Sequence, residues 1–397
     1  MRFDIHMRKS MRDRLADVTT RMAAWDQRQP PSQELHQRLV DAIEPFDHTV
    51  SAPGLVVGGV DGSGDFPAIA YADSFVYATV ASATLYQADS VHGLKEVEKD
   101  LQPLIEFTWL TTSEQQRATS LLDTFERLAG LPVDEILAGS DYSLLGNQRR
   151  RSIAEQRSGL IVPPAHDAGN VGIQLRTTAE LGAALRLVEI VPEGAIVLTD
   201  GTMSLPFVNR DKQSLFFEYL RRFCCVRARS RAVRFAALSK SHGLPSGVRL
   251  EEAAQAKCGS AEPEHWFLKL PDSDRDGWSL WPPDGPRVPP LGAVSFLVRL
   301  HRTTPIMRLD LDARFWEDQM EAGRNLQAVR QFFGLLDYAS HDQRCFGYPY
   351  PIKAAHDRGS LTEQERTVLR QQLVESAVHA GMRRASFRDS SQLTGHR

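Results

Sequence analysis

The sequence predicts an α/β fold, a mixed sheet flanked by helices, and three features of the chain support it. Two short apolar runs, GLVVGGVDG at 54–62 and GAIVLTDG at 194–201, each end in Asp-Gly. β-Branched and aromatic residues dominate 68–86, as they do in strands. From 176 to 241, helix-type and strand-type patterns alternate, which is typical of helices packed on a sheet.

The remaining elements follow from local patterns in chain order. Apolar positions at helical spacing predict two helices within 8–46, separated by a break at 27–33. The later elements are a helical segment over 95–160, helices at 176–191 and 211–225, strands at 293–302 and 305–312, a helix at 313–337, and a last helix that begins near Leu361. Thr362 is a suitable N-cap for that last helix, because Glu365 follows it by three residues.

The predicted domain organisation is a helical arm, one large domain and a tail. The arm covers 1–50, the domain 51–380 and the tail 381–397. Within the domain, the helical segment at about 95–165 is predicted to be an insertion. A Gly, Pro, Asp and Trp-rich stretch predicts a long irregular loop at about 243–290.

Composition limits the class of protein. Of the 397 residues, 42% are hydrophobic and 24% charged, which is ordinary for a globular protein. The formal net charge of −3 argues against a uniformly basic DNA-coating protein, so any nucleic-acid site must be local. The four cysteines show neither zinc-ligand spacing nor the density of a disulfide scaffold, and no run of about 18 apolar residues occurs. We therefore expect a cytoplasmic protein without a membrane segment.

Two aspartates are candidates for metal binding because of their positions. Asp61 and Asp200 each end an apolar strand and precede a glycine, so their side chains are expected at the mouth of the sheet, where backbone can approach a ligand. Phosphodiester hydrolysis by the two-metal route needs carboxylates from separate elements. The alternative for each residue is an ordinary Asp-Gly turn.

A glutamate between the two aspartates completes the predicted set of carboxylates. Glu180 is expected in the first turn of the 176–191 helix, with Thr177 or Thr178 as N-cap. A strand Asp, a helix Glu and a second strand Asp is the order found in ribonuclease H-like nucleases. The structural alternative is a carboxylate placed by the helix dipole alone. Two further glutamates are alternatives for the helix carboxylate, Glu189 and Glu193.

Four segments of the chain resemble the NurA nucleases, a family similar to ribonuclease H and Argonaute nucleases. They are GGVDGSG around Asp61, VLTDGTMSL around Asp200, FAALSKS around Lys240, and GYPYPIKAAH. The last is the most specific, because the family pairs Gly-Tyr-Pro with a histidine eight residues after the tyrosine, as Tyr348 and His356 are placed here. Thr199 and Thr202, which flank the second Asp-Gly, depart from the family pattern.

The resemblance covers about 54–86 and 170–380, and it implies a ribonuclease H-like fold and a metal-dependent DNA nuclease. The implied activities are 5′ to 3′ exonuclease and single-strand endonuclease cleavage, with Mn²⁺ or Mg²⁺ as cofactor. The implied partners are DNA, held in the central channel of a homodimer, and a HerA-like hexameric ATPase in DNA end processing. The implied metal ligands are Asp61, Glu180, Asp200 and His356, and the implied catalytic residues are these four with Lys240 and Tyr348.

The chemistry of the last segment suits such a site. His356 can bind a metal or donate a proton, and the Tyr348 hydroxyl can orient a phosphate. Pro349 and Pro351 predict that the chain turns before a helix begins, which places His356 near a helix start, where it tends to stay neutral. The alternative is a capped loop with a half-buried tyrosine and a surface histidine.

Basic residues predict contacts with DNA phosphates. Lys240 ends a strand, where its ammonium can meet a phosphate or a carboxylate. Six arginines lie within 221–234 without an acidic residue between them, and such density can neutralise phosphates. The predicted DNA-binding residues are Arg221, Arg222, Arg227 and Arg229. A solvated helix end followed by an exposed loop explains the same arginines.

Three functions compete on the sequence alone. The first is the metal-dependent nuclease, and the second is a non-catalytic ribonuclease H-like protein that binds DNA or docks on an ATPase motor. The third, weaker alternative is a ribonuclease H-like phosphatase or nucleotide binder. Retention of the four implied metal ligands favours the enzyme. The chain has no P-loop of the form G-x-x-x-x-G-K-[ST], so motor activity must come from a partner.

Overall fold

The computed structural model describes most of the chain. The described residues are 5–27, 33–64, 67–71, 74–89, 93–97, 101–145, 151–203, 214–240, 247–259, 264–271, 292–321 and 326–387. They divide into two compact units, a smaller one within 1–43 and 246–263 and a larger one within 44–245 and 264–397.

The smaller unit is helical. It contains α1 (Ile5–Gln27) and α2 (Gln33–Ala42), which confirm the two helices predicted at the start of the chain. It also contains α8 (Gly247–Cys258), which packs on α2. The prediction of an irregular loop throughout 243–290 is wrong here, because Leu250, Ala253 and Ala254 form a buried row at helical spacing. Within that predicted loop, residues 243–246, 260–263 and 272–290 lie outside the described residues.

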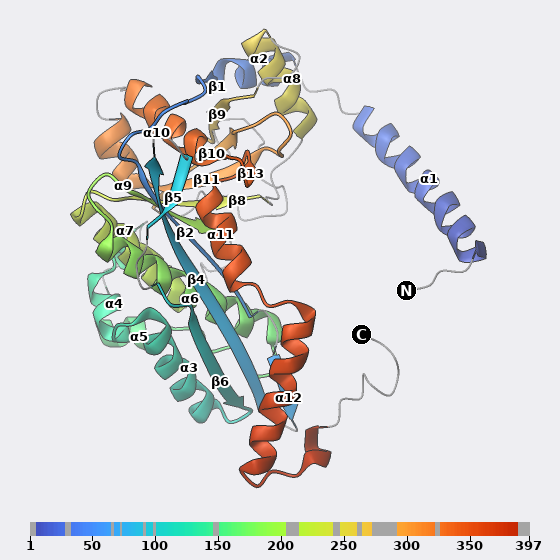
Figure 1. The fold of residues 1–397 in the computed structure, drawn as a ribbon, viewed down its shortest axis with the longest axis vertical. Coiled ribbons are helices and arrows are strands. Elements are labelled where there is room, and N and C mark those ends of the chain that lie inside the picture. The colour runs from blue at the N-terminus through green and yellow to red at the C-terminus, as the bar shows by residue number, and fades with distance from the viewer. Residues whose placement is uncertain are drawn as a thin grey trace. The chain divides into compact units, whose positions relative to one another are not determined.

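The larger unit is built on one mixed sheet, which confirms the predicted fold class. In the described residues eleven strands form this sheet; nine follow the order β1, β9, β10, β11, β8, β7, β2, β4, β3, while β5 and β6 also pair with β4 (Figure 1). Strand β7 pairs in parallel with β2 and with β8. The other described ladders of this sheet are antiparallel: β10 pairs with β9 and β11, β11 pairs with β8, and β4 pairs with β2, β3, β5 and β6. The strands are β1 (Ile43–Pro45), β2 (Val56–Ser63), β3 (Pro67–Tyr71), β4 (Ser74–Asp89), β5 (Gly93–Glu96), β6 (Leu104–Thr111), β7 (Ile196–Asp200), β8 (Arg234–Ser239), β9 (Trp266–Lys269), β10 (Ala293–Arg299) and β11 (Met307–Asp312).

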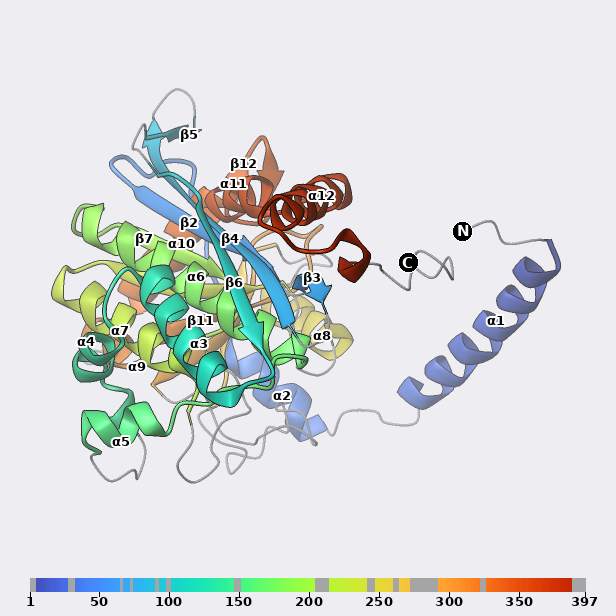
Figure 2. The same cartoon turned by 90° about the horizontal axis from the view of Figure 1, so that it is seen from below.

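Helices cover both faces of this sheet. Figure 2 shows β4 and β6 with α3 and α6 on one side and α11 on the other, in agreement with the contacts of these helices. The first group of helices is α3 (Glu114–Ala129), α4 (Val133–Gly139), the 3₁₀ turn η1 (Tyr142–Leu144), α5 (Ile153–Ser158), α6 (Ala168–Ile190) and α7 (Phe216–Ser230). The second comprises α9 (Ala313–Trp316), a π-helical turn (Glu317–Glu321), α10 (Leu326–Ala339), α11 (Tyr350–Gly359), α12 (Glu363–His379) and the 3₁₀ turn η4 (Arg384–Phe387). A hairpin of β12 (His341–Asp342) and β13 (Cys345–Phe346) precedes α11.

Three predicted elements differ from the structure. The segment 95–165 is not helical throughout, because β6 lies inside it as a long partner of β4. The helix predicted at 176–191 begins eight residues earlier, at Ala168, where the Asp167 side chain accepts a hydrogen bond from the backbone N–H of Asn170. The helix predicted at 313–337 is divided into α9, the π-helical turn and α10.

The last predicted helix is confirmed together with its cap. The Thr362 side chain accepts a hydrogen bond from the Glu365 backbone N–H, and the Glu365 carboxylate accepts one from the Thr362 backbone N–H. The end of the predicted tail, 388–397, lies outside the described residues. Among the described helices, none has both the length and the apolar character of a membrane-spanning segment.

Strand alternation divides the core of the larger unit between the two faces of the sheet. On β7, Val197 joins the apolar cluster formed with α6 and α7, whereas Ile196 and Leu198 join the cluster formed with α10 and α11. On β2, Val57 belongs to the α10 and α11 side. Alternate residues that follow Val57 and Leu198 therefore point to the face covered by α11.

Candidate functional site

Asp61 and Asp200 lie side by side on neighbouring parallel strands. The β2–β7 ladder pairs Val60 with Thr199, and the two aspartates are the next residues of each strand. Both continue the rows that face α11, so their carboxylates share one face of the sheet. The two Asp-Gly sequences that looked like separate turns are thus adjacent in space.

Only one of these aspartates ends its strand as predicted. Asp200 is the last residue of β7, but Asp61 pairs with Ser82 of β4 and β2 continues to Ser63. The expected strand end at Asp61 is therefore wrong. The reason is the length of β4, whose 16 residues keep β2 paired beyond the point where the parallel ladder with β7 stops.

His356 contacts Asp61 from α11. The Nδ1 atom of His356 lies 2.5 Å from Oδ2 of Asp61, and the other oxygen of Asp61 accepts a hydrogen bond from the Gly62 N–H at 2.8 Å. The helix is joined to the sheet at both ends, because the Thr84 hydroxyl donates to the Pro351 carbonyl and the Ser63 hydroxyl donates to the Gly359 carbonyl, each at 2.7 Å. These contacts fix the imidazole beside the carboxylate.

The expected position of His356 near a helix start is wrong. α11 begins at Tyr350, with Pro351 in its first turn, where proline is tolerated because its missing N–H would have no helical partner. His356 consequently lies in the last turn of the helix, so the positive end of the helix dipole does not act on it.

Lys240 and Tyr348 complete the group around Asp200. Lys240 follows β8 directly, and its Nζ lies 3.7 Å from Oδ2 of Asp200 and 4.1 Å from the centre of the Tyr348 ring. Tyr348 is buried, and its hydroxyl has no hydrogen-bond partner of ordinary geometry among the described residues, although it is near enough to Asp200 to affect the pKa of that carboxyl. A buried polar atom without such a partner normally calls for a ligand or ordered water.

The electrostatics of the site favour a bound cation. Burial raises the pKa of Asp200, Asp61 raises it further, and Lys240, Tyr348 and His356 oppose this only in part. Burial likewise raises the pKa of the Tyr348 hydroxyl, which both aspartates reinforce. Ionising Asp200 at this buried position is therefore costly, and a cation beside the two carboxylates would offset that cost.

Glu180 approaches the same strand from the opposite face. It is buried in the interior of α6, and a Cβ atom at Gly62 would lie 3.0 Å from its Cγ and 3.2 Å from its Oε1. Because Gly62 is next to Asp61 in the strand, its missing side chain points away from the Asp61 side chain. The glycine thus lets Glu180 reach β2 just behind Asp61, with Arg176 Nε 3.5 Å from its carboxylate.

The expected placement of Glu180 in a first helical turn is wrong, since α6 begins at Ala168 and Thr178 is buried inside it. The two alternative glutamates lie elsewhere. Glu189 pairs with Arg227 of α7 at 2.7 Å. Glu193 precedes β7, so it lies at the opposite end of that strand from Asp200.

Three of the four arginines predicted to bind DNA are occupied within the protein. Arg221 is buried and donates to Glu218 at 3.0 Å. Arg222 is buried between Asp141 and Asp312, and Arg229 contacts the same two aspartates. Arg221 and Arg222 are therefore not surface phosphate ligands, a correction to the sequence prediction. Arg227 pairs with Glu189 but keeps 45% of its side chain exposed.

A groove beside the site was not predicted from the sequence. It has a volume of about 270 Å³ and runs from Ser63 and Gly64, two and three residues after Asp61, to α12. Arg366 and Arg370 of α12 line its far wall. Local patterns predict α12 as a helix, but they do not show that it packs beside β3, so the groove and its two arginines emerge only in the folded chain.

Comparison with known proteins supports the fold. No family model matches the sequence, and no curated protein matches it. Among solved structures, the NurA nuclease from Sulfolobus solfataricus matches with a TM-score of 0.50 and 15% identity over 94% of this chain and 98% of that chain. A second crystal structure of NurA matches with a TM-score of 0.39 and 10% identity, over 95% and 99% of the two chains. The Sulfolobus match extends over nearly the full length of both proteins, and the chain therefore has the fold of the NurA nuclease.

Proposed function

We propose that this protein is a metal-dependent DNA nuclease of the NurA type. The observation that carries the proposal is the pair Asp61 and Asp200 on adjacent strands, with His356 2.5 Å from Asp61 and Lys240 3.7 Å from Asp200. A structural protein gains little from this arrangement, because an ionised carboxylate that is buried in the way Asp200 is buried lowers stability unless a cation or a substrate uses it.

The residues at the site fit a divalent cation. Asp61, Asp200 and His356 would hold it, and the Tyr348 hydroxyl is available to its hydration shell or to a phosphate. Glu180, the fourth predicted ligand, reaches β2 from the opposite face of the sheet and lies behind Asp61. Oxygen ligands with one imidazole suit Mn²⁺ or Mg²⁺. When bound, such an ion supplies Lewis-acid stabilisation of the charge that develops on a phosphoryl oxygen and an activated water.

The protein's own side chains would orient the phosphodiester. Lys240 lies beside both Asp200 and the ring of Tyr348, so its ammonium can stabilise charge on a phosphate while the ring restricts its position. His356, held by Asp61, can pass a proton to a leaving oxygen if it does not ligate the metal. Tyr348 remains protonated near neutral pH, because burial raises its pKa, and can donate its hydroxyl hydrogen to a phosphate oxygen.

The groove between β2 and α12 is the proposed path for a DNA strand. It begins at Ser63 and Gly64, and Arg366 and Arg370 line it. Arginines along a groove neutralise phosphates. Arg227 stays a predicted DNA contact on a different helix. Cleavage as a 5′ to 3′ exonuclease and single-strand endonuclease, and DNA end processing with a HerA-like ATPase, belong to the same proposal.

The experiment that tests the proposal is digestion of end-labelled single-stranded and double-stranded DNA with Mn²⁺, with Mg²⁺ or with a chelator. We expect cleavage with either ion and none with the chelator. If the protein bound DNA but did not cleave it under any of these metal conditions, the result would support the alternative, a non-catalytic docking partner of an ATPase motor.

His356 and Tyr348 are expected to have separable roles. The variant His356→Ala should raise the Mn²⁺ concentration for half-maximal cleavage by at least about 10-fold, because a ligand or its immediate partner is lost. The variant Tyr348→Phe should lower the rate at saturating metal with little change in metal requirement, because it removes one hydroxyl. The measurement is the cleavage rate as a function of Mn²⁺. An unchanged metal requirement in His356→Ala would leave His356 as a proton donor or a structural residue.

A homodimer is the proposed assembly, and β6 offers a surface for it. Three large apolar side chains on alternate positions of this strand are exposed, Ile105 by 60%, Phe107 by 42% and Trp109 by 56%. Such a row on one face of a strand is characteristic of interfaces.

The variant Trp109→Arg is expected to raise the dimer dissociation constant by at least about 30-fold. Leu144→Arg provides the matched control, because Leu144 is also an exposed apolar residue, by 53%, but lies off the strand. Sedimentation velocity over a concentration series measures both. A wild-type protein that stays monomeric, or a Trp109→Arg variant that dimerises as well as the control, would contradict the proposed interface.

A further inference from the structure

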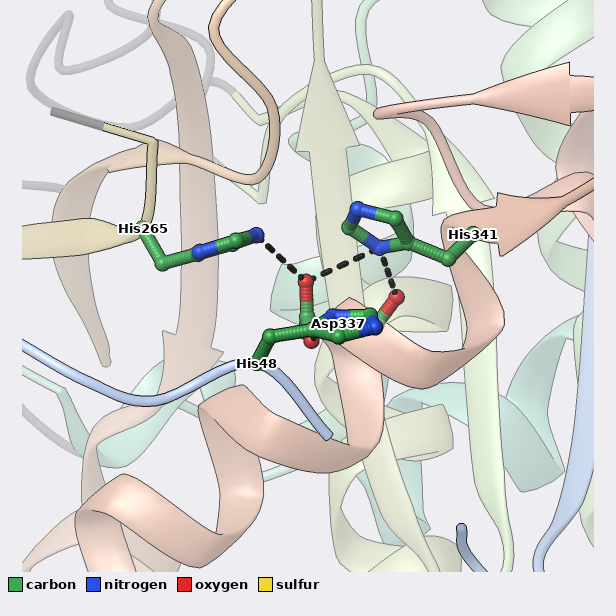
Figure 3. Close-up of side chains that lie close together, drawn as sticks. All are labelled: His48, His265, Asp337 and His341. Carbon is green, nitrogen blue, oxygen red and sulfur yellow. Dashed lines mark hydrogen bonds and ion pairs between the residues drawn. The ribbon is translucent and has the colours of Figure 1, made fainter. Parts of the chain in front are cut away.

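Three histidines and one aspartate form a separate cluster in the larger unit. His48 follows β1, His265 precedes β9, Asp337 belongs to α10 and His341 begins β12. Each offers one possible ligand atom, and the four atoms lie within 4.8 Å of one another. Figure 3 shows His265 and His341 approaching one oxygen of Asp337 from two sides, with His48 beside the same carboxylate.

The contacts within this cluster are short, but two of them are not hydrogen bonds. His48 Nδ1 lies 2.9 Å from Oδ2 of Asp337, and His341 Nδ1 and His265 Nε2 lie 3.0 and 3.2 Å from Oδ1. Neither contact to Oδ1 has the direction of a hydrogen bond: among the described residues, His265 Nε2 and Asp337 Oδ1 have no hydrogen-bond partner, and His341 Nδ1 pairs with the Asp337 carbonyl instead. A ring nitrogen and a carboxylate oxygen that converge without pairing are expected at a coordination site without its ion.

The buried carboxylate needs a positive charge. The side chain of Asp337 has no exposed surface, and among the described residues no lysine or arginine forms an ion pair with it. Burying an ionised carboxylate is costly unless a cation accompanies it. The described neighbours that can meet this need are the three imidazoles, either through a proton or through a metal ion that they share with the carboxylate.

We propose that His48, His265, Asp337 and His341 form a structural site for a divalent transition metal of the Zn²⁺ class. Three imidazole nitrogens and one carboxylate oxygen complete a tetrahedral set, and imidazole-rich sets favour Zn²⁺ over Mg²⁺ and Mn²⁺. Bonds of about 2.0–2.1 Å place tetrahedral ligands about 3.3–3.5 Å apart, so side-chain shifts of about 1.5 Å or less close the site.

The surroundings of the cluster support a built site. The Asp337 carboxylate is oriented by the Thr49 N–H, which donates to Oδ2 at 2.8 Å. Such a second contact holds a ligand in place around a metal. The rings of His48 and His265 are stacked 5.5 Å apart, and Phe46 packs on His265. His48 keeps 42% of its side chain exposed, which leaves a route for an ion to enter.

A metal here would join segments that are distant in sequence. His48 lies near the start of the larger unit and 289 residues before Asp337, and the short hairpin that begins at His341 leads directly to Tyr348. Binding would therefore stabilise the folded state and anchor the segment that carries Tyr348.

Cobalt binding tests the proposal independently of nuclease activity. The protein used is the full chain carrying Asp200→Asn, which weakens ion binding at the other site, stripped with a chelator and titrated with Co²⁺. We expect one equivalent to bind with the intense visible absorption of tetrahedral cobalt, Zn²⁺ to displace it, and Zn²⁺ to raise the Tm. The variant His48→Ala should weaken binding by at least about 10-fold. His48 is chosen because its side chain is partly exposed, so truncating it removes little core packing.

His301→Ala is the matched control. The His301 ring lies 5.7 Å from that of His341, yet His301 is outside the ligand group, so cobalt affinity should be unchanged. No tetrahedral absorption, or equal affinity in His48→Ala and the parent, would overturn the proposal and leave imidazolium protons as the counter-charge of Asp337. Failure of DNA cleavage in the wild type would not affect this result.

Discussion

Asp200→Asn is expected to remove cleavage almost completely and to leave the fold as stable as the wild type, or more stable. Asp200 would hold the catalytic cation together with Asp61, and an amide is a weaker ligand than a carboxylate. Loss of several kcal/mol of transition-state stabilisation corresponds to a rate decrease of at least about 10²-fold to 10³-fold. Cleavage of end-labelled DNA at saturating Mn²⁺ measures the effect.

The stability of this variant follows from the sign of the pKa shift. Burial raises the pKa of Asp200 above its ordinary value, and Lys240 opposes this only in part. When folding raises the pKa of a group, the fold favours the protonated form of that group. The resulting stabilisation is fully present at a pH below the unfolded-state pKa and is lost as the pH rises through the folded-state pKa. At neutral pH the Asp200 carboxylate therefore lowers the free energy of unfolding in the absence of metal, and replacing it with a neutral amide relieves that effect.

Asp141→Asn is the opposite control. Burial opposes ionisation of Asp141, but Arg222 and Arg229 outweigh it and lower its pKa, so its carboxylate stabilises the fold above the unfolded-state pKa. This variant should lower the Tm while cleavage below the transition is kept. Thermal unfolding without metal compares the two. A lower Tm in Asp200→Asn than in the wild type, or wild-type cleavage by that variant, would contradict the assignment of Asp200.

The sequence predicts the strands of the site better than their ends and contacts. The strand β7 ends at Asp200 because its ladder with β2 stops at Thr199 and its ladder with β8 stops at Asp200. The similar run before Asp61 does not end there, because β4 continues alongside it. α6 is buried on most sides, so it lacks the periodic polar face that would have revealed its start at Ala168.

Long-range pairing explains the other differences. No acidic residue lies between the arginines of 221–234, but Asp141 and Asp312, about 80 and 90 residues away from Arg222, provide counter-charges for Arg222 and Arg229. His48 and Asp337 are separated by 289 residues, so no local motif marks their cluster. By contrast, Tyr348 and His356 lie eight residues apart in one segment, and the family resemblance placed both at the candidate site.

Gly59→Ala is expected to disturb both the fold and the site. An added Cβ would lie 2.2 Å from the carbonyl carbon of Pro351, 2.3 Å from its oxygen and 2.4 Å from the Ile352 nitrogen. All three are backbone atoms of α11, which cannot rotate away as a side chain can. The helix must move, although Thr84 and Ser63 hydrogen-bond its two ends to the sheet. Overpacking of this kind costs about 1–3 kcal/mol, and more where backbone must shift.

Because α11 carries His356, the same displacement should separate its imidazole from Asp61 and slow cleavage even below the unfolding transition. Gly169→Ala is the matched control: the nearest atom to its added Cβ is the Asp167 carboxylate oxygen at 4.0 Å, and the position lies in the first turn of α6. We expect Gly59→Ala to lower the Tm by several degrees and to reduce cleavage, and the control to change neither. If Gly59→Ala had the Tm and the cleavage rate of the control, α11 would not pack against Gly59 as it does in the structure. Some other contact would then have to hold His356 beside Asp61.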